Sequence, residues 1–212
     1  MISIVIPVYN EEEYIDGCLK SLISQKTDAK FEVVIVDNNS TDRTVEIVQK
    51  YTSKLPLRIL HEDRQGIVFA RSRGFDEAKG TILARIDADC IAPNNWIANI
   101  EKNFEKKIDG VCGPYHYYDG PWFVNNPLLK TIYLAVLRML FGHETMLGFN
   151  CALTSSIWRK VRVKATHMPM RMHEDLALGT LISKHGTLYF DKHLLMNTSF
   201  RRLHRNFFFF CF

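Results

Sequence analysis

Short apolar runs alternate with amphipathic segments over the first 107 residues of the chain. The apolar runs are ISIVIP (2–7), EVVIVD (32–37), LRILHE (57–62) and TILARID (81–87). Short runs rich in Ile and Val are typical of buried strands. The pattern therefore predicts repeated βαβ units and an α/β fold, with a mostly parallel central sheet flanked by helices.

The segments between these runs have helical spacing. In the clearest one an apolar stripe repeats about every 3.6 residues, and it contains Tyr14, Ile15, Cys18, Leu19, Leu22 and Ile23. In the second, Val45, Val48 and Tyr51 share a face, and residues 40–42 can cap the first turn. A third helix is expected after Gly66 and a fourth over residues 94–104.

After residue 107 the pattern changes. Residues 110–118 are typical of a strand, 126–141 and 173–184 of helices, and 187–190 and 194–198 of two short strands. Because no repeat or low-complexity linker divides the chain, we expect a single domain over residues 1–212. The terminal run NFFFFCF is unusual for a soluble protein, so we expect that the second half is cut short at its C-terminal end.

Charge and cysteine content exclude some classes. The chain has 27 basic and 23 acidic residues, a net charge of +4. It has no long basic block, so we expect no nucleic-acid partner, while a small anionic ligand stays open. The five cysteines are scattered without a C-x-x-C pair, which argues against a disulfide framework or a zinc site. MISIVIPVYNEEE is wrongly flanked for a signal peptide. We therefore expect a cytoplasmic protein.

Polar residues follow three of the first four predicted strands. They are Tyr9-Asn10-Glu11, Asp37-Asn38-Asn39-Ser40 and Asp87-Ala88-Asp89. Each group alone is common in turns and helix caps. Ligands of open α/β sheets, however, bind beyond the carboxyl ends of the strands. The convergence of the three groups therefore predicts a binding site at this edge.

Asp87 and Asp89 are one residue apart at the tip of the fourth strand. In an extended segment both side chains point the same way, and two bare carboxylates would repel each other. A divalent cation shared with a bound diphosphate removes this cost, so the pair predicts a Mg²⁺ or Mn²⁺ site. The chain has neither a G-x-G-x-x-G nor a G-x-x-x-x-G-K-[ST] motif, which argues against a dinucleotide dehydrogenase and a P-loop enzyme.

Four motifs in order, SIVIPVYNEEEYI, VVIVDNNSTDRT, GIVFARSRGFDEAKG and ARIDADC, resemble the nucleotide-binding half of a family 2 glycosyltransferase with the GT-A fold. GFNCALTSSIWRKV and HEDLALGTLISKHG resemble the acceptor-binding half. The resemblance implies a nucleotide-sugar-binding half at residues 1–107 and an acceptor-binding half at 108–212. It also implies inverting transfer of a sugar from a nucleoside diphosphate donor, usually with Mg²⁺ or Mn²⁺.

The resemblance assigns roles to single residues on the donor side. Pro7, Tyr9 and Glu11 are expected to line the base and ribose pocket, with Asp37 on the nucleobase and Asn39 beside it. Arg71 is expected to approach the Asp87 side of the donor site. Asp89 is the principal expected metal ligand, and Asp87 lies nearer the ribose and Arg71.

On the acceptor side the resemblance points to the Glu174-Asp175 pair. It implies that one of the two, more often the Asp, is the general base. Acidic residues also begin helices without any catalytic task. Arg201 and Arg202, in TSFRRLHR, resemble arginines that close over a diphosphate. Basic residues near a chain end can instead simply be solvated.

The expected donor is a UDP-sugar, with a GDP-sugar as the second choice, and the expected acceptor is a sugar or a lipid-linked molecule. The expected donor and acceptor together indicate a role in the synthesis of cell-envelope polysaccharide, lipids or glycoconjugates. One alternative is a catalytically inactive nucleotide-sugar-binding protein. Another is a sugar nucleotidyltransferase, which would favour a glycine-rich N-terminal phosphate loop that this chain lacks.

The predicted helix at 126–141 has one broad apolar face, formed by Leu129, Ile132, Tyr133, Val136, Leu137 and Leu140. Its apolar run is shorter than the roughly 20 residues of a membrane span. Lys130 and Arg138 flank the face, as in helices that lie in a membrane interface. We therefore expect peripheral contact with the inner face of a membrane. The alternative is that this face packs on the sheet as core.

Overall fold

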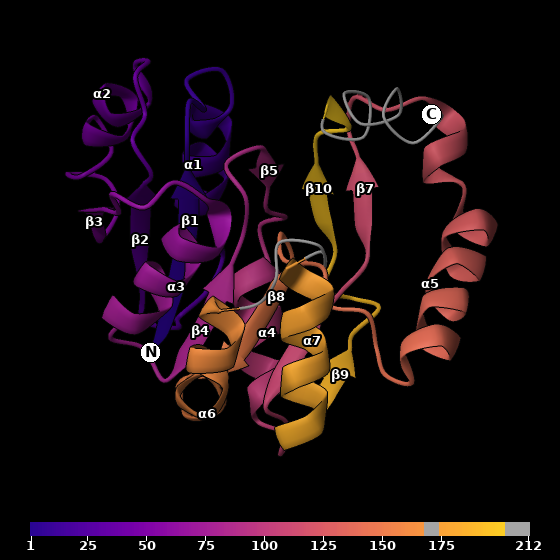
Figure 1. Cartoon of the computed structure of the whole chain (residues 1–212). Coiled ribbons are helices and arrows are strands. Elements are labelled where there is room, and N and C mark those ends of the chain that lie inside the picture. The colour runs from indigo at the N-terminus through magenta and orange to yellow at the C-terminus, as the bar shows by residue number, and fades with distance from the viewer. Residues whose placement is uncertain (168–173, 202–212) are drawn as a thin grey trace.

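The computed structural model describes residues 1–167 and 174–201, and Figure 1 shows their arrangement. The strands are β1 (Ile2–Val8), β2 (Phe31–Asp37), β3 (Leu57–His61), β4 (Ile82–Arg85), β5 (Cys90–Ile91), β6 (Gly110–Cys112), β7 (Tyr115–Tyr117), β8 (Cys151–Thr154), β9 (Leu188–Phe190) and β10 (Met196–Thr198). The helices are α1 (Ile15–Ile23), α2 (Thr44–Gln49), α3 (Ile67–Glu77), α4 (Trp96–Phe104), α5 (Pro127–Phe141), α6 (Ser155–Thr166) and α7 (Glu174–His185), with a 3₁₀ turn at Trp122–Asn125.

The strands form two sheets. The larger has the order β3-β2-β1-β4-β8-β6-β9, and all its pairs are parallel except the two made by β8. The smaller has the order β5-β10-β7. From β1 the chain moves outward to β2 and β3 and then returns to place β4 on the other side of β1. The β1/β4 boundary is therefore a topological switch point, where open α/β sheets bind ligands.

Alternate residues of the strands feed two hydrophobic cores. On one face Ile4 and Ile6 of β1 pack with residues of α1, α2 and α4. On the other, Val5 of β1 and Val36 of β2 pack with residues of α3, α6 and α7. Each buried Val or Ile stabilises the fold by about 1.5–3 kcal/mol. The predicted sheet flanked by helices is confirmed, and the two cores hold the strand ends in place.

Two expectations about the second half need correction. Residues 110–118 form two strands in different sheets, β6 and β7, instead of one. Pro114, between them, cannot donate a backbone hydrogen bond. At Gly113 a Cβ atom would lie 2.0 Å from the carbonyl oxygen of Leu194, so the chains approach closely there. In addition, no element was assigned to residues 151–166, which form β8 and α6.

The predicted helix at 126–141 is present as α5. It begins at Asn126, whose side chain accepts hydrogen bonds from the backbone N–H groups of Leu128 and Leu129, and it ends at Gly142 with φ of 73°. Figure 1 shows α5 at the edge of the molecule, beyond β7. No residue of α5 is buried, so the alternative that its apolar face packs as core is wrong. Among the described residues, no helix combines the length and apolar content that crossing a bilayer requires.

Candidate active site

The first of three neighbouring cavities lies at the carboxyl end of β1. We call it the strand-end cavity; it has a volume of about 330 Å³. Its lining residues are Pro7, Val8, Tyr9, Glu11, Asn38, Gln65, Gly66, Ile67 and Ala70. The end of β1, the loop after β2 and the start of α3 therefore build it together. The structure brings Pro7, Tyr9 and Glu11 together, as expected.

Asp37 and Asn39 lie beside the strand-end cavity and are not among its lining residues. The Asp37 carboxylate accepts a hydrogen bond from the backbone N–H of Ser40 at 3.1 Å, and its other oxygen lies 3.3 Å from Nδ1 of His61. The Asn39 side chain donates to the carbonyl of Asp63 at 2.9 Å. In this structure both side chains order the surrounding loops.

Asn38 lines the cavity, although the sequence analysis singled out its neighbours. Its Oδ1 accepts a hydrogen bond from the backbone N–H of Gly66 at 2.7 Å. Gly66 has φ of 139°, a backbone conformation that strongly favours glycine. Asn38 therefore ties the end of β2 to the turn that begins α3. The sequence signals for this wall were the polar group after the second strand, which contains Asn38, and the Gly before a helical segment.

The second cavity, of about 250 Å³, contains four acidic side chains. We call it the carboxylate cavity. Its lining residues are Ile67, Arg85, Asp87, Asp89, Tyr117, Phe149, Glu174, Asp175, Thr198 and Ser199. Asp87 and Asp89 follow β4, whereas Glu174 and Asp175 begin α7. Ile67 lines this cavity and the strand-end cavity, so the two adjoin.

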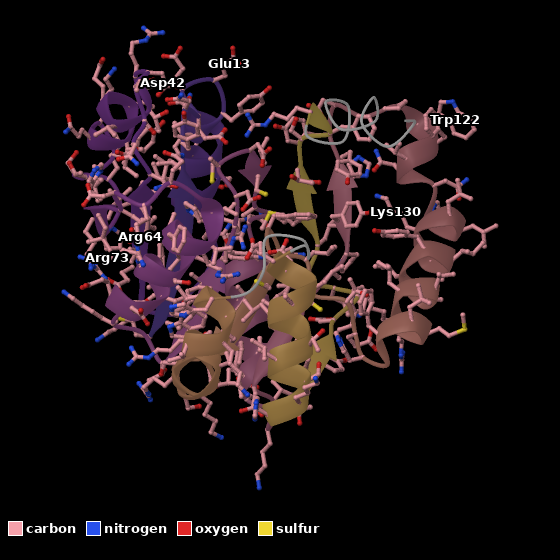
Figure 2. All side chains as sticks on the ribbon, viewed as in Figure 1. Glu13, Asp42, Arg64, Arg73, Trp122 and Lys130 are labelled. Atoms are coloured by element: carbon pink, nitrogen blue, oxygen red, sulfur yellow. The ribbon has the colours of Figure 1, made fainter. Side chains whose placement is uncertain are left out.

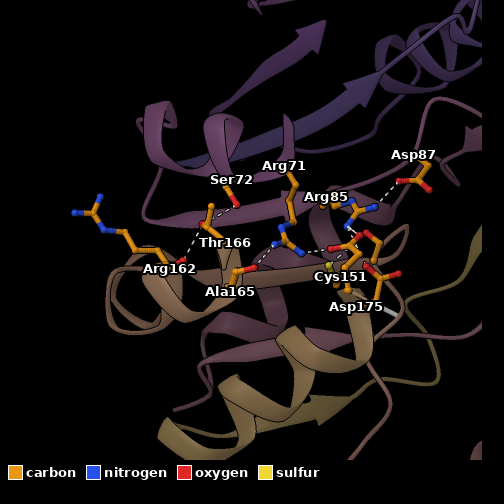
Figure 3. A network of polar contacts seen from close by, with 11 residues as sticks. Arg71, Ser72, Arg85, Asp87, Cys151, Arg162, Ala165, Thr166 and Asp175 are labelled. Atoms are coloured by element: carbon orange, nitrogen blue, oxygen red, sulfur yellow. Dashed lines mark hydrogen bonds and ion pairs between the residues drawn. The ribbon is translucent and has the colours of Figure 1, made fainter. Parts of the chain in front are cut away.

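Arg85 connects Asp87 with the Glu174-Asp175 pair, and Figure 3 shows it between Asp87 and Asp175. Its Nη1 donates to Glu174 Oε1 at 2.5 Å and to Asp175 Oδ1 at 3.0 Å, and its Nη2 donates to Asp87 Oδ1 at 3.1 Å. The Arg85 side chain is only 2% exposed. In the sequence Arg85 lies within a run that is typical of a buried strand, so no functional role was predicted for it.

Arg71 does not contact Asp87, contrary to expectation. It donates to Glu174 and, at 3.2 Å, to the carbonyl of Ala165 in α6. The reason is that Arg85, from β4, already occupies the space beside Asp87. Arg71 is fully buried on the face of α3 that packs toward α6. From this position it forms an ion pair with Glu174.

The two carboxylates at the start of α7 differ in acidity. Burial alone would raise the pKa of Glu174, but the charges of Arg85 and Arg71 outweigh burial and hold this pKa at about 2. Burial, and then the adjacent negative charge of Glu174, raise the pKa of Asp175 well above its usual range. Asp175 is therefore the more basic carboxylate.

Gly148 leaves room for this arrangement. A Cβ atom at this position would lie 2.1 Å from Asp175 Oδ1 and 2.6 Å from Arg85 Nη1. Any larger residue would push the carboxylate away from its partner. The glycine of the GFN stretch therefore has a steric role in the carboxylate cavity.

Arg201 contacts one acidic residue of each cavity, Asp89 and Glu11. Its Nε donates to Asp89 Oδ2 at 2.8 Å, its Nη2 donates to Glu11, and its guanidinium lies 4.0 Å from the ring centroid of Tyr14. For this arginine, the alternative of a simply solvated chain end is wrong. Arg202 lies outside the described residues.

The donor atoms here suit a hard divalent cation. Asp87 and Asp89 are 5% and 3% exposed and line the same cavity. β4 ends at Arg85, so the pair converges through the turn that follows and not through an extended strand as expected. Within residues 1–167 and 174–201 there is no cluster of three or more His, Cys, Asp or Glu side chains that could bind a metal. Two carboxylates still fit Mg²⁺ or Mn²⁺ when phosphate oxygens complete the coordination.

The sequence is similar to known glycosyltransferases. The model for "Glycosyl transferase family 2" matches residues 3–162. Glycosyltransferase AglE of Haloferax volcanii is 42% identical over 99 residues, which cover 45% of this chain and 33% of the relative. Glycosyltransferase GlyG of Streptococcus pneumoniae is 34% identical over 122 residues, which cover 56% of this chain and 40% of the relative. The matches thus span only about a third to two fifths of the length of these relatives.

The fold is also similar to that of solved structures. S. aureus TarS 1–349 superposes with a TM-score of 0.75 at 19% identity, over 93% of this chain and 60% of TarS. Mannosyltransferase PcManGT from Pyrobaculum calidifontis, solved with GDP-Man and Mn²⁺, gives 0.71 at 21% identity, over 93% of this chain and 56% of PcManGT. These neighbours have the GT-A fold, so the predicted fold is confirmed. The family model matches residues 3–162, which are more than half of this chain. This chain therefore belongs to glycosyl transferase family 2.

Proposed function

We propose that this chain transfers a sugar from a nucleoside diphosphate sugar to an acceptor hydroxyl with inversion at the anomeric carbon. The observation that carries the proposal is the carboxylate cavity, in which Asp87 and Asp89 lie with Glu174 and Asp175. A protein that only binds a nucleotide sugar would need the first pair alone. A second pair of carboxylates in the same cavity, in which Asp175 is more basic than Glu174, supports chemistry on an acceptor.

In this proposal residues 1–107 bind the donor and residues 108–212 bind the acceptor. The nucleoside occupies the strand-end cavity, with Pro7, Tyr9 and Glu11 in its wall. Asp37 and Asn39 act through the loops that they order. A UDP-sugar is the favoured donor and a GDP-sugar the second choice. TarS has been solved with UDP-GlcNAc and PcManGT with GDP-Man, which supports both.

Asp87 and Asp89 would hold Mg²⁺ or Mn²⁺ on the diphosphate. When bound, the metal would supply positive charge that stabilises the departing nucleoside diphosphate. Arg201 would add a second positive charge beside the diphosphate, since its guanidinium lies within hydrogen-bond distance of Asp89 and Glu11. Guanidinium groups suit phosphate oxygens. Arg202 remains a prediction, since it lies outside the described residues.

Asp175 is the proposed general base. It accepts the proton of the acceptor hydroxyl while the oxygen of that hydroxyl bonds to the anomeric carbon. The bond from that carbon to the diphosphate oxygen breaks, and the nucleoside diphosphate leaves with the electron pair. Attack from the face opposite the leaving group inverts the centre. Glu174 suits this task less, because its pKa of about 2 makes it a weak base.

Asp175→Asn tests this proposal. The substitution keeps the size of the side chain but removes its basicity, so transfer should fall by about 10²-fold or more. Binding of UDP or GDP with Mn²⁺ should stay unchanged. The measurements are nucleotide release with UDP- and GDP-sugars and panels of acceptors, and calorimetric nucleotide binding.

Glu174→Gln is the matched comparison. If Glu174→Gln abolishes transfer while Asp175→Asn does not, the base is the other carboxylate. A parent chain that binds nucleotide but turns over no donor with any acceptor would favour the inactive nucleotide-sugar-binding protein.

We place the reaction in the synthesis of cell-envelope polysaccharide, lipids or glycoconjugates, on the cytoplasmic side of a membrane. The exposed apolar face of α5 supports peripheral contact with that membrane, since residues such as Leu129, Ile132 and Leu140 are more than half exposed.

A further inference from the structure

A third cavity, of about 450 Å³, lies between the small sheet and α5. We call it the aromatic cavity. Its lining residues are Tyr115, Tyr117, Phe123, Val124, Leu129, Lys130, Tyr133, Leu147, Phe149 and Phe200. Lys130 is the single ionisable cation among these lining residues, and Figure 2 shows it between α5 and β7. The remaining side chains are aliphatic or aromatic.

The aromatic cavity adjoins the carboxylate cavity. Tyr117 and Phe149 line both. The ring of Tyr115 packs edge to face on each of them, with centroid distances of 5.0 Å and 5.6 Å. An apolar wall therefore leads from the cavity that contains Asp175 to residues of α5. A molecule with its hydroxyl at Asp175 can continue into this space.

Lys130 does not make the cavity polar. Its Nζ donates to the carbonyl of Tyr115 at 2.8 Å and to Oδ1 of Asn125 at 2.9 Å. It also lies 4.5 Å from the ring centroid of Tyr115. The protein itself thus satisfies much of the hydrogen-bonding capacity of the ammonium group. The surface left for a ligand is mostly apolar, and the phenol hydroxyls of Tyr115, Tyr117 and Tyr133 are its other polar side-chain groups.

The far end of the aromatic cavity opens onto α5. Leu129 and Tyr133 are 55% and 52% exposed although they line the cavity. Beyond them, the outer surface of α5 continues with further exposed apolar side chains. A flexible chain that enters at the carboxylates can therefore leave along an apolar surface, whereas a compact ring would fill only the cavity.

We propose that the aromatic cavity is an acceptor subsite that binds an aliphatic chain attached close to the reacting hydroxyl. The acceptor is then an amphiphile, with its sugar or other polar head in the carboxylate cavity. This inference rests on the proposed transfer reaction, because it takes Asp175 as the point where the hydroxyl binds.

Alkyl glucosides test the subsite on the full 212-residue chain. With UDP and Mn²⁺ present, n-octyl β-D-glucoside below its micelle concentration should bind about 10-fold or more tightly than methyl β-D-glucoside. Burial of a few methylene groups is sufficient for this difference. Calorimetry gives the affinities, and methyl resonances of labelled Leu and Val report where the chain binds.

Two substitutions on the same helix distinguish binding of the octyl chain in the cavity from binding elsewhere on α5. Leu129→Gln, at a lining residue, should remove most of the octyl preference. Leu140→Gln should leave it intact, because Leu140 is 68% exposed and is not a lining residue. Val124→Asn, at a lining residue outside α5, is a second lining variant. Circular dichroism checks that each variant is folded.

Equal affinity for the octyl and methyl glucosides would overturn the proposal, as would equal losses in Leu129→Gln and Leu140→Gln. A cavity already filled by another segment or a second copy would also bind no octyl chain and would count against it. UDP binding with Mn²⁺, measured in the same samples, distinguishes a failure of the proposed subsite from a failure of the proposed transfer reaction. If UDP binds without an octyl preference, only the subsite is wrong. If neither UDP nor GDP binds with Mn²⁺, the transfer reaction itself is contradicted.

Discussion

At the scale of single residues, the candidate site consists of buried charges that satisfy one another. Arg85 forms ion pairs with Asp87, Glu174 and Asp175, and Arg71 adds a second positive charge beside Glu174. Arg201 forms ion pairs with Asp89 and Glu11. Removing one member of such a group leaves an uncompensated charge, which is costly in a buried position. Substitutions that keep shape and change charge are therefore the informative ones.

Asp89→Asn should weaken the Mn²⁺-dependent binding of UDP while the fold stays intact. The substitution removes a negative charge that we propose to bind the metal, and Asn keeps nearly the same shape. Calorimetric titration with Mn²⁺ and with a chelator measures the effect. Asp28→Asn, at an exposed position, is the control and should bind as the parent does. Equal affinity of the parent with Mn²⁺ and with chelator would contradict the metal site.

Glu174→Gln should move the acidic limb of the pH profile to lower pH. The base must be ionised, so kcat/KM falls as the pH drops through the raised pKa of Asp175. Removing the negative charge of Glu174 lowers the pKa of Asp175, so more of the base stays ionised at a given acidic pH. The measurement is kcat/KM from about pH 5 to about pH 9 in parent and variant. An unchanged limb, or a shift to higher pH, would speak against Asp175 as the base.

At the scale of elements, close packing of α3 on the sheet aligns the strand-end cavity with the carboxylate cavity. α3 begins at Ile67, which lines both, and it carries Arg71, which holds Glu174. Gly74 permits the approach, since a Cβ atom there would lie 2.3 Å from Cγ1 of Val5 and 3.0 Å from Cγ2 of Val36. The position of α3 against the sheet thus depends on the absence of a side chain at Gly74.

Gly74→Ala should lower the free energy of unfolding by about 1–3 kcal/mol, because the added methyl group overpacks the core. Gly17→Ala in α1 is the matched control. A Cβ atom there meets nothing within 4 Å, and alanine favours a helix over glycine by up to about 1 kcal/mol. Urea denaturation of both variants measures the difference. Equal stability of the two variants would contradict the packing argument.

The other element with a testable role is α5. Its exposed apolar face predicts that the chain co-sediments with anionic vesicles. A variant with Leu137→Glu and Leu140→Glu should stay in the supernatant, because two carboxylates oppose both burial and the anionic surface. No residue of α5 is buried, so the variant should remain folded by circular dichroism. Absence of binding by the parent would rule out the membrane contact.

At the scale of the whole molecule, three cavities lie in sequence from the strand-end cavity to α5. Ile67 joins the first to the second, and Tyr117 and Phe149 join the second to the third. The end of β1, the loop after β2 and the start of α3 supply the wall of the first cavity, and the small sheet with α5 supplies that of the last. In the proposed reaction this order separates the donor from the acceptor and puts the reacting atoms between them.

Much of this arrangement could be predicted from the sequence, because it depends on local patterns. Alternation of apolar strands and amphipathic helices determines an α/β sheet. Parallel strands have their carboxyl ends at one edge, so Glu11, Asp37 and Asp89 could be expected at the same edge of the sheet. The family motifs carried the same information for Glu174 and Asp175.

Other features were decided only by the tertiary structure. Arg85 reads as an ordinary strand residue until a helix that begins 89 residues later places Glu174 beside it. Arg71 meets Glu174 instead of Asp87 because α6 and α7 pack on that side of the sheet. Residues 110–118 are divided between two sheets, and at the break Gly113 lies against the carbonyl of Leu194, far away in the sequence. Such contacts join distant segments, and local propensity carries no information about which side chains will share a buried space.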